Sequence, residues 1–146
     1  MASNLKYSNG SRDAQQQGLI TYAGSGAIIS IYQGTQPVNA NTAISGQTLL
    51  VSLVVSGSFG TDSNGTITLS SVTNGTAVAT GTAQFFRIFK SDNSTVIMDG
   101  TVGITGCDMN LNNTSIATTQ VVSLTSGTII RANQDRKSTR LNSSHT

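Results

Sequence analysis

The segment Asp62-Ser63-Asn64-Gly65 has the residue types that open a calcium-binding loop. A complete loop of that kind also needs a later glutamate that binds calcium through both carboxylate oxygens. The sequence contains no glutamate. The same four residues are typical of a turn between two strands. We therefore expect a turn here and no metal site.

Nucleophilic catalysis lacks its base in this sequence. Cys107 is the only cysteine, so no internal disulfide can form, and the only histidine is His145, close to the C-terminus. A catalytic thiol or serine hydroxyl needs a neighbouring base to activate it. Four of the five aspartates before residue 135 fall at expected turns or element ends, which disfavours a paired-carboxylate site. We expect a structural Cys107, no cofactor and no enzymatic activity.

The segment Asp135 to His145, DRKSTRLNSSH, resembles the conceptual translation of a common sequencing adapter. The match runs over eleven consecutive residues of unusual composition. Segments that do not belong to the native chain are kept out of reasoning about the fold. We therefore expect one domain over residues 1–134, loose at 1–10, and a non-native tail at 135–146.

Removing this tail changes the charge of the chain. The full sequence has 8 Lys+Arg and 6 Asp+Glu, and the tail holds three of the former and one of the latter, which leaves five of each. The basic character therefore belongs to the tail, and nucleic-acid binding through a basic surface loses its support. Charged residues make up 10% of the sequence, against about a quarter in ordinary domains. A neutral surface of this kind has little repulsion between copies and permits assembly.

The fold class follows best from the stretch Gly81 to Gly103. Two runs rich in β-branched and aromatic residues, Ala83 to Lys90 and Thr95 to Val102, flank Ser91-Asp92-Asn93-Ser94 and predict a hairpin. We expect a three-residue loop, Ser91 to Asn93, with Asn93 in the left-handed region. The loop length decides which side chains share a face. The expected core face carries Phe86, Ile88, Val96, Met98 and Val102.

The other face of this hairpin is mixed, and it provides the candidate site. Arg87 and Asp99 lie there as diagonal neighbours within reach of each other. They form either a binding pair or a structural ion pair on a half-covered face, and the second interpretation is favoured because such pairs are common. The candidate interface consists of Phe85, Arg87, Phe89, Ile97 and Asp99. The alternative is that these side chains cover a second layer of core.

The residue pattern of the remaining sequence predicts further short strands and one helix. Ser11 is the expected cap of a helix that ends at about Ala23, with Asp13 near its positive end. Ala27 to Tyr32 is apolar on both faces and predicts a central strand, whereas Asp108 to Asn112 predicts a short edge strand. About 7–9 strands at this spacing indicate an all-β fold, an antiparallel β-sandwich or jelly roll with one short N-terminal helix. No apolar stretch approaches the length of about 20 residues that spans a membrane.

The order of these features resembles a family of small bacteriophage and prophage proteins encoded among virion structural genes. The matching pieces are Ile31-Tyr32-Gln33-Gly34-Thr35, Thr48-Leu49-Leu50, Gly81 to Ile88, Met98 to Gly103 and Asp108 to Ile116. The resemblance spans roughly Ser11 to Ile130, and its motifs are structural. Gln15-Gln16-Gln17 stands where the family usually has aliphatic residues, which bears on how the helix packs.

The resemblance implies a non-enzymatic virion structural protein: a capsid decoration, connector or tail component made in the bacterial host cytoplasm. Its partners would be copies of itself or other virion proteins, with no nucleic acid or membrane. The alternative is a glycan-binding or adhesin-type β-sandwich module. That function favours aromatic stacking platforms, and this chain has no tryptophan and only Tyr7, Tyr22 and Tyr32.

Overall fold

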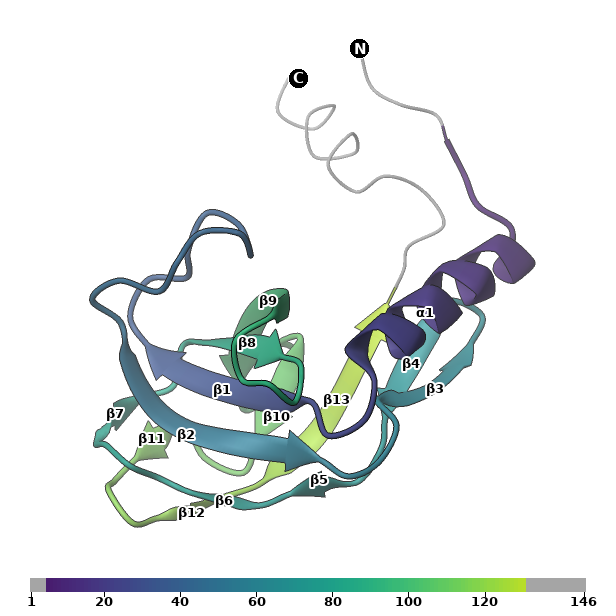
Figure 1. Ribbon diagram of the computed structural model, residues 1–146. Coiled ribbons are helices and arrows are strands. Elements are labelled where there is room, and N and C mark those ends of the chain that lie inside the picture. Colours follow the sequence, from purple (N-terminus) through teal and green to yellow (C-terminus); the bar gives the residue numbers. More distant parts are fainter. Residues whose placement is uncertain (1–4, 131–146) are drawn as a thin grey trace.

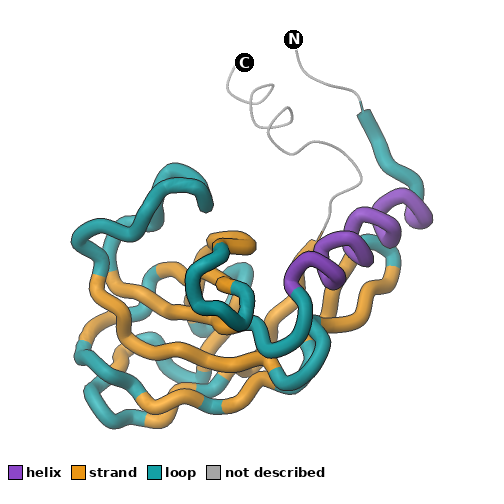
Figure 2. The backbone as a smooth tube through the Cα atoms, in the orientation of Figure 1, coloured by secondary structure: helices purple, strands orange, loops and turns teal. Residues whose placement is uncertain are grey.

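Strands dominate the computed structural model, which describes residues 5–130 (Figures 1 and 2). Within these residues it has one helix, α1 (Asn9–Ala23). The strands are β1 (Ile28–Gln33), β2 (Thr48–Val55), β3 (Gly60–Ser63), β4 (Thr66–Leu69), β5 (Val72–Thr73), β6 (Gly75–Thr76), β7 (Gly81–Thr82), β8 (Phe85–Phe89), β9 (Val96–Gly103), β10 (Met109–Leu111), β11 (Ser115–Ile116), β12 (Val121–Val122) and β13 (Leu124–Ile130). The predicted all-β, sandwich-like fold is confirmed. The predicted tail at 135–146 lies outside the described residues.

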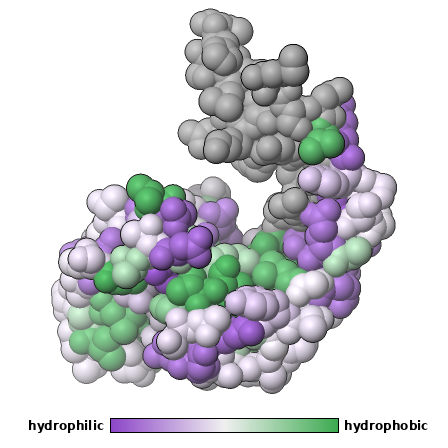
Figure 3. Space-filling model, turned by 45° about the horizontal axis from the view of Figure 1, so that its top comes forward, coloured by the Kyte–Doolittle hydropathy of each residue, from purple (hydrophilic) through white to green (hydrophobic). Residues whose placement is uncertain are grey.

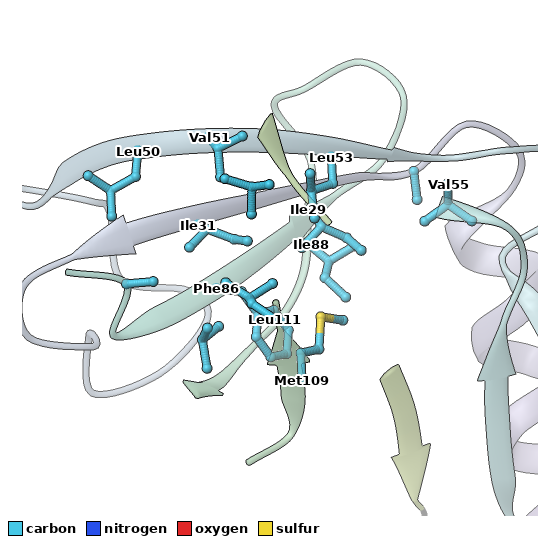
Figure 4. Close-up of a cluster of buried hydrophobic side chains, with 14 of the residues drawn as sticks. Ile29, Ile31, Leu50, Val51, Leu53, Val55, Phe86, Ile88, Met109 and Leu111 are labelled. Carbon is cyan, nitrogen blue, oxygen red and sulfur yellow. The ribbon is translucent and has the colours of Figure 1, made fainter. Parts of the chain in front are cut away.

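The main sheet has nine strands in the order β3-β4-β13-β10-β9-β8-β1-β2-β5. It bends strongly, so that side chains of β1, β2 and β8 point toward those of β10 across one core (Figures 1 and 4). Ile29, Ile31 and Leu53 are fully buried there, and Met109 and Leu111 are almost so. The predicted central position of the first strand is confirmed, because β1 pairs with β2 on one side and β8 on the other.

Two short sheets of two strands each accompany the main sheet. β6 pairs with β12, and β7 pairs with β11. The N–H of Val78 donates to the carbonyl of Leu50 at 2.8 Å, which ties this part of the chain to β2. A side chain at Gly75 would approach the Ser52 carbonyl to 2.4 Å, so only glycine permits this close packing of β6 on β2.

The expected edge strand at 108–112 is wrong in position. β10 covers Met109–Leu111 and lies inside the sheet, parallel to β9 on one side and antiparallel to β13 on the other. The alternation of Met109 and Leu111 with polar neighbours shows only that one face of the strand is buried, and it does not show that β9 and β13 pair with the strand on its two sides. The carboxylate of Asp108 accepts from the N–H of Thr101 at 2.9 Å.

The helix begins earlier than expected. Ser8 is the N-cap, and its hydroxyl accepts from the N–H of Ser11 at 3.1 Å, so the prediction of Ser11 as the cap is wrong. The helix therefore also occupies part of the segment expected to be loose. Asp13 lies beyond the first turn and accepts from the N–H of Gly65 instead, at 2.8 Å. The helix ends at Ala23 before Gly24, as predicted.

Polar contacts attach the helix to the β3–β4 hairpin and β13. Gln16 is buried, and its amide donates to the carbonyls of Gly65 and Ile129 at 2.8 and 3.0 Å. Gln17 donates to the Asp62 carboxylate at 2.6 Å. Gln16 and Gln17 therefore attach the helix by hydrogen bonds. Among the described residues, no helix is long and apolar enough to cross a membrane.

The central hairpin forms, with a different loop from the one predicted. The N–H of Lys90 donates to the carbonyl of Thr95, so the loop has four residues, 91–94, and not three. Asn93 has φ 57°, which confirms its left-handed conformation. An irregularity between Ile88 and Phe89 offsets the longer loop. The predicted core positions of Phe86 and Ile88 are therefore confirmed. The predicted core position of Val96 is wrong, because Val96 lies before the irregularity and pairs with Phe89 on the opposite face.

Asp92 organises this loop, and its contribution to stability is expected to depend on pH. Hydrogen bonds from the hydroxyl and N–H of Thr95 and the N–H of Ser94 lower the pKa of Asp92 from 3.8 to about 2. A carboxyl with a lowered folded pKa stabilises the fold above its unfolded pKa, and this contribution is lost as pH falls through the folded pKa. Wild type should therefore exceed Asp92→Asn in unfolding free energy at neutral pH.

This difference should shrink between pH values of about 4 and about 2, where the carboxyl becomes protonated and resembles the amide. Urea unfolding of both proteins across this pH range measures the difference. A difference that stays constant down to the lower limit would show that the charge of Asp92 does not stabilise the loop.

Candidate functional site

The face of β2, β1, β8 and β9 that points away from the core holds the predicted interface. We call it the outer face. The strand registers align its side chains in three rows that cross the four strands. The rows are an apolar row (Val54, Ile28, Phe89 and Val96), a polar row (Ser52, Ser30, Arg87 and Asp99) and an aromatic row (Leu49, Tyr32, Phe85 and Thr101).

The polar row contains a buried ion pair. Arg87 lies directly opposite Asp99, and its Nε and Nη2 donate to the two carboxylate oxygens at 2.7 and 2.9 Å. Both side chains are almost completely buried, at 3% and 4% exposure. The hydrogen bonds to Asp99 raise the pKa of Arg87 above its ordinary value, so the guanidinium stays charged. The Ser30 and Ser52 hydroxyls, 3.3 Å apart, continue the row.

The aromatic row lies next to this pair. The rings of Tyr32 and Phe85 are stacked, with centroids 5.1 Å apart and an angle of 14° between their planes. Both residues are buried. Burial raises the pKa of the Tyr32 phenol, although a hydrogen bond with Ser30 and the charge of Arg87 act in the opposite direction. Tyr32 is therefore neutral near pH 7.

The apolar row is the only one of the three rows in which every side chain is at least partly accessible. Val54 is 43% exposed, and Ile28, Phe89 and Val96 are partly buried. In Figure 3, hydrophobic side chains gather in the middle of the surface, between the loop that follows β1 and the helix. Apolar side chains that remain accessible beside one another on a sheet are suited to contact with another protein surface.

The structure brings together some of the five predicted interface residues. Arg87 and Asp99 meet, directly opposite rather than diagonally, and they are buried with Phe85. Phe89 is partly exposed in the apolar row. Ile97 does not share this face: it is the unpaired residue of the irregularity and packs partly against the core. Of the predicted interface residues that lie on the outer face, Phe89 is therefore the one with accessible surface. The interface stays a prediction.

Two important residues were missing from the predicted site. Tyr32 stacks on Phe85 because β1 lies beside β8. These strands are about 50 residues apart in the sequence, and the alternation of apolar and polar residues along each strand does not show which strands pair. Asn39, in the loop between β1 and β2, accepts from Nη2 of Arg87 through its backbone carbonyl at 3.4 Å. Every residue has a backbone carbonyl, so the residue type at position 39 could not predict this hydrogen bond.

The segment 62–65 forms the predicted turn. Asn64 and Gly65 have φ values of 50° and 82°, as a two-residue hairpin loop requires, and Ser63 pairs with Thr66. The carboxylate of Asp62 is bonded to Gln17. Among the described residues, no group of three or more His, Cys, Asp or Glu side chains is placed to hold a metal ion.

A scan against protein-family models finds no match to the chain, and neither the curated proteins nor the solved structures give a significant match.

Proposed function

We propose that the chain is a non-enzymatic virion structural protein of a bacteriophage: a capsid decoration, connector or tail component that acts by protein–protein assembly. The observation that carries the proposal is the apolar row. Val54 exposes 43% of its surface beside the partly accessible Ile28 and Phe89. The neutral, hydroxyl-rich composition of residues 1–134 is compatible with close contact between copies or with a shell protein.

The segments that resemble phage virion proteins include part of this surface. The matching segments Gly81 to Ile88 and Met98 to Gly103 include most of β8 and β9, which build the outer face. A rigid sheet face with accessible apolar side chains and few charges suits permanent assembly better than transient contact, because obligate interfaces are the more hydrophobic ones.

Quantitative mass spectrometry of density-purified particles from the source sample tests the proposal. The tryptic peptide Ser91 to Arg131 identifies the chain. We expect the peptide to be present at a fixed ratio to the major shell protein, near-equal for a shell decoration and small for a connector or tail part. Absence from particles together with abundance in the cell lysate would refute the virion assignment. Binding to a defined sugar in a glycan array would then favour the adhesin-type alternative.

A matched pair of variants tests the apolar row itself. Val54→Lys places a charge in the row, whereas Val78→Lys places one at a valine that is 65% exposed and lies outside it. We expect Val54→Lys to reduce the amount of purified chain that sediments with particles and Val78→Lys to leave it unchanged. Equal binding of both variants would show that the apolar row is not the contact surface.

A further inference from the structure

The loop between β1 and β2, residues 34–47, is built around Asn39. The side chain of Asn39 accepts from the N–H of Asn41 at 2.9 Å and the hydroxyl of Thr42 at 3.2 Å. Its backbone carbonyl accepts from the N–H of Thr42 at 3.1 Å. The middle of the loop is therefore a defined turn. In Figure 1, the loop rises from the end of β1 and turns inward above the sheet.

This loop is attached to the sheet by a few hydrogen bonds. Near its start, the N–H of Gly34 donates to the Gln84 side chain at 2.7 Å. In its middle, the Asn39 carbonyl accepts from Nη2 of Arg87 at 3.4 Å, a long bond. Every residue from 34 to 47 is exposed or only partly buried. Segments with few buried contacts open at a small free-energy cost, well below that of global unfolding.

On β1 and β8, but not on β2, the burial of the outer face increases toward this loop: Leu49 on β2 is 38% exposed. Along β1 and β8, the residues near the end from which the loop starts are the buried ones: Tyr32 and Phe85 are 8% and 1% exposed. At the other end of these strands, Ile28 and Phe89 are partly exposed. Since the Asn39 carbonyl reaches Arg87 in the middle row, the loop extends back over the face from the end of β1.

We propose that the β1–β2 loop is a lid, held closed by the hydrogen bond between Arg87 and the Asn39 carbonyl, which opens to uncover Tyr32, Phe85 and Arg87, the buried members of the aromatic and polar rows. Arg87 keeps both bonds to Asp99 when the lid opens, and the second N–H of its Nη2, which had donated to Asn39, becomes available to another acceptor. The group that it loses is a backbone carbonyl. The matching partner is a polypeptide segment that supplies a carbonyl to Arg87 and an apolar side chain to Tyr32 and Phe85.

The identity of this partner as a virion protein rests on the proposed function, whereas the opening of the lid does not. The opening can be measured on the isolated full-length chain. Hydrogen–deuterium exchange reports the amides of residues 34–47, and hydroxyl-radical footprinting reports the side-chain exposure of Tyr32 and Phe85. The variants are Asn39→Ala, which loosens the turn, and Arg87→Lys, whose single ammonium cannot reproduce the fork of bonds to Asp99 and Asn39. The matched control is Asn41→Ala, in the same turn, where the hydrogen bond uses only the backbone N–H.

We expect wild-type loop amides to exchange faster than those of β1. Asn39→Ala removes the two hydrogen bonds that the side chain accepts. It should raise loop exchange at least about fivefold, the factor that corresponds to one net hydrogen bond, and should also raise oxidation of Tyr32 and Phe85. Arg87→Lys should do the same, and Asn41→Ala should match wild type. Unchanged exchange in Arg87→Lys would refute the bond as the closing contact, because this variant alters the donor, whereas Asn39→Ala keeps the backbone carbonyl and tests the turn that positions it. Faster loop exchange without increased oxidation would refute the loop as the cover. Neither result depends on whether the chain is found in particles.

Discussion

Asp99→Ala should lower the free energy of unfolding by about 3–5 kcal/mol, because it leaves the Arg87 guanidinium buried without its counter-charge. Both side chains are almost fully buried, and the pair is bidentate. This cost is several times that of an exposed ion pair, which is worth about 0–1 kcal/mol. Urea unfolding of wild type and variant gives the difference.

The double variant Arg87→Met/Asp99→Leu separates the cost of an unpaired charge from the value of the pair. Replacing both partners with apolar side chains of similar size is often neutral or stabilising. We therefore expect the double variant to be much more stable than Asp99→Ala alone. If the double variant is as unstable as the single one, packing or hydrogen bonding around the pair, and not the buried charge, would dominate. A loss in Asp99→Ala below about 1 kcal/mol would mean that the pair behaves as a solvated one.

The sequence was informative about the hairpin for a definite physical reason. Phe86 and Ile88 alternate along the strand with Phe85 and Arg87, so the two pairs of side chains point to opposite faces. Changing the loop by an even number of residues leaves the partner strand facing the same way, whereas an odd change turns its side chains to the other face. A four-residue loop alone would have inverted one strand. The irregularity after Ile88 restores the parity beyond the loop, so the predicted core positions of Phe86, Ile88 and Val102 were correct although the loop was wrong. The prediction failed at Val96, which lies on the loop side of the irregularity and pairs with Phe89 on the outer face.

The burial of the candidate site could not be predicted in the same way. It depends on β1 lying beside β8 and on a loop that returns over the face, and both are long-range contacts. From its residue type, Arg87 would be expected at the surface, because charged side chains are seldom buried. Only Asp99 indicated a partner for Arg87, and no residue type indicated the contact with the Asn39 carbonyl. The same limit applies to β10, whose short alternating pattern fits an edge strand as well as the internal position that it takes.

The outer face therefore divides into a part that is accessible in the isolated chain and a part that the lid covers. The apolar row offers contact without any rearrangement, whereas Tyr32, Phe85 and Arg87 become accessible only when the loop moves. A partner that first binds the apolar row would lie next to the loop and could then compete for Arg87. Assembly through such a surface couples docking to the opening of the lid, because only the open state offers Arg87 to the partner.

Phe86→Ala is expected to destabilise the fold by about 3–5 kcal/mol, the usual cost of removing a large aromatic side chain from a core. Phe86 is 2% exposed and lies opposite Gly100 in the β8–β9 pair. A methyl group on Gly100 would approach the Phe86 ring to 2.4 Å, so the ring occupies the space that the glycine leaves open. Gly100→Ala should therefore cost about 1–3 kcal/mol by overpacking.

The two substitutions should not be additive, because they act on the same space. In Phe86→Ala/Gly100→Ala, the new methyl group fills part of the cavity and no longer meets the ring, so the double variant should lose less than the sum of the single losses. Gly18→Ala is the control: nothing lies within 4 Å of its added methyl group, and alanine should stabilise the helix by up to about 1 kcal/mol. Urea unfolding of all four variants measures the coupling. Additive losses would mean that the ring and the glycine do not share this space, and that Gly100 is required for another reason, such as its approach to Asp108.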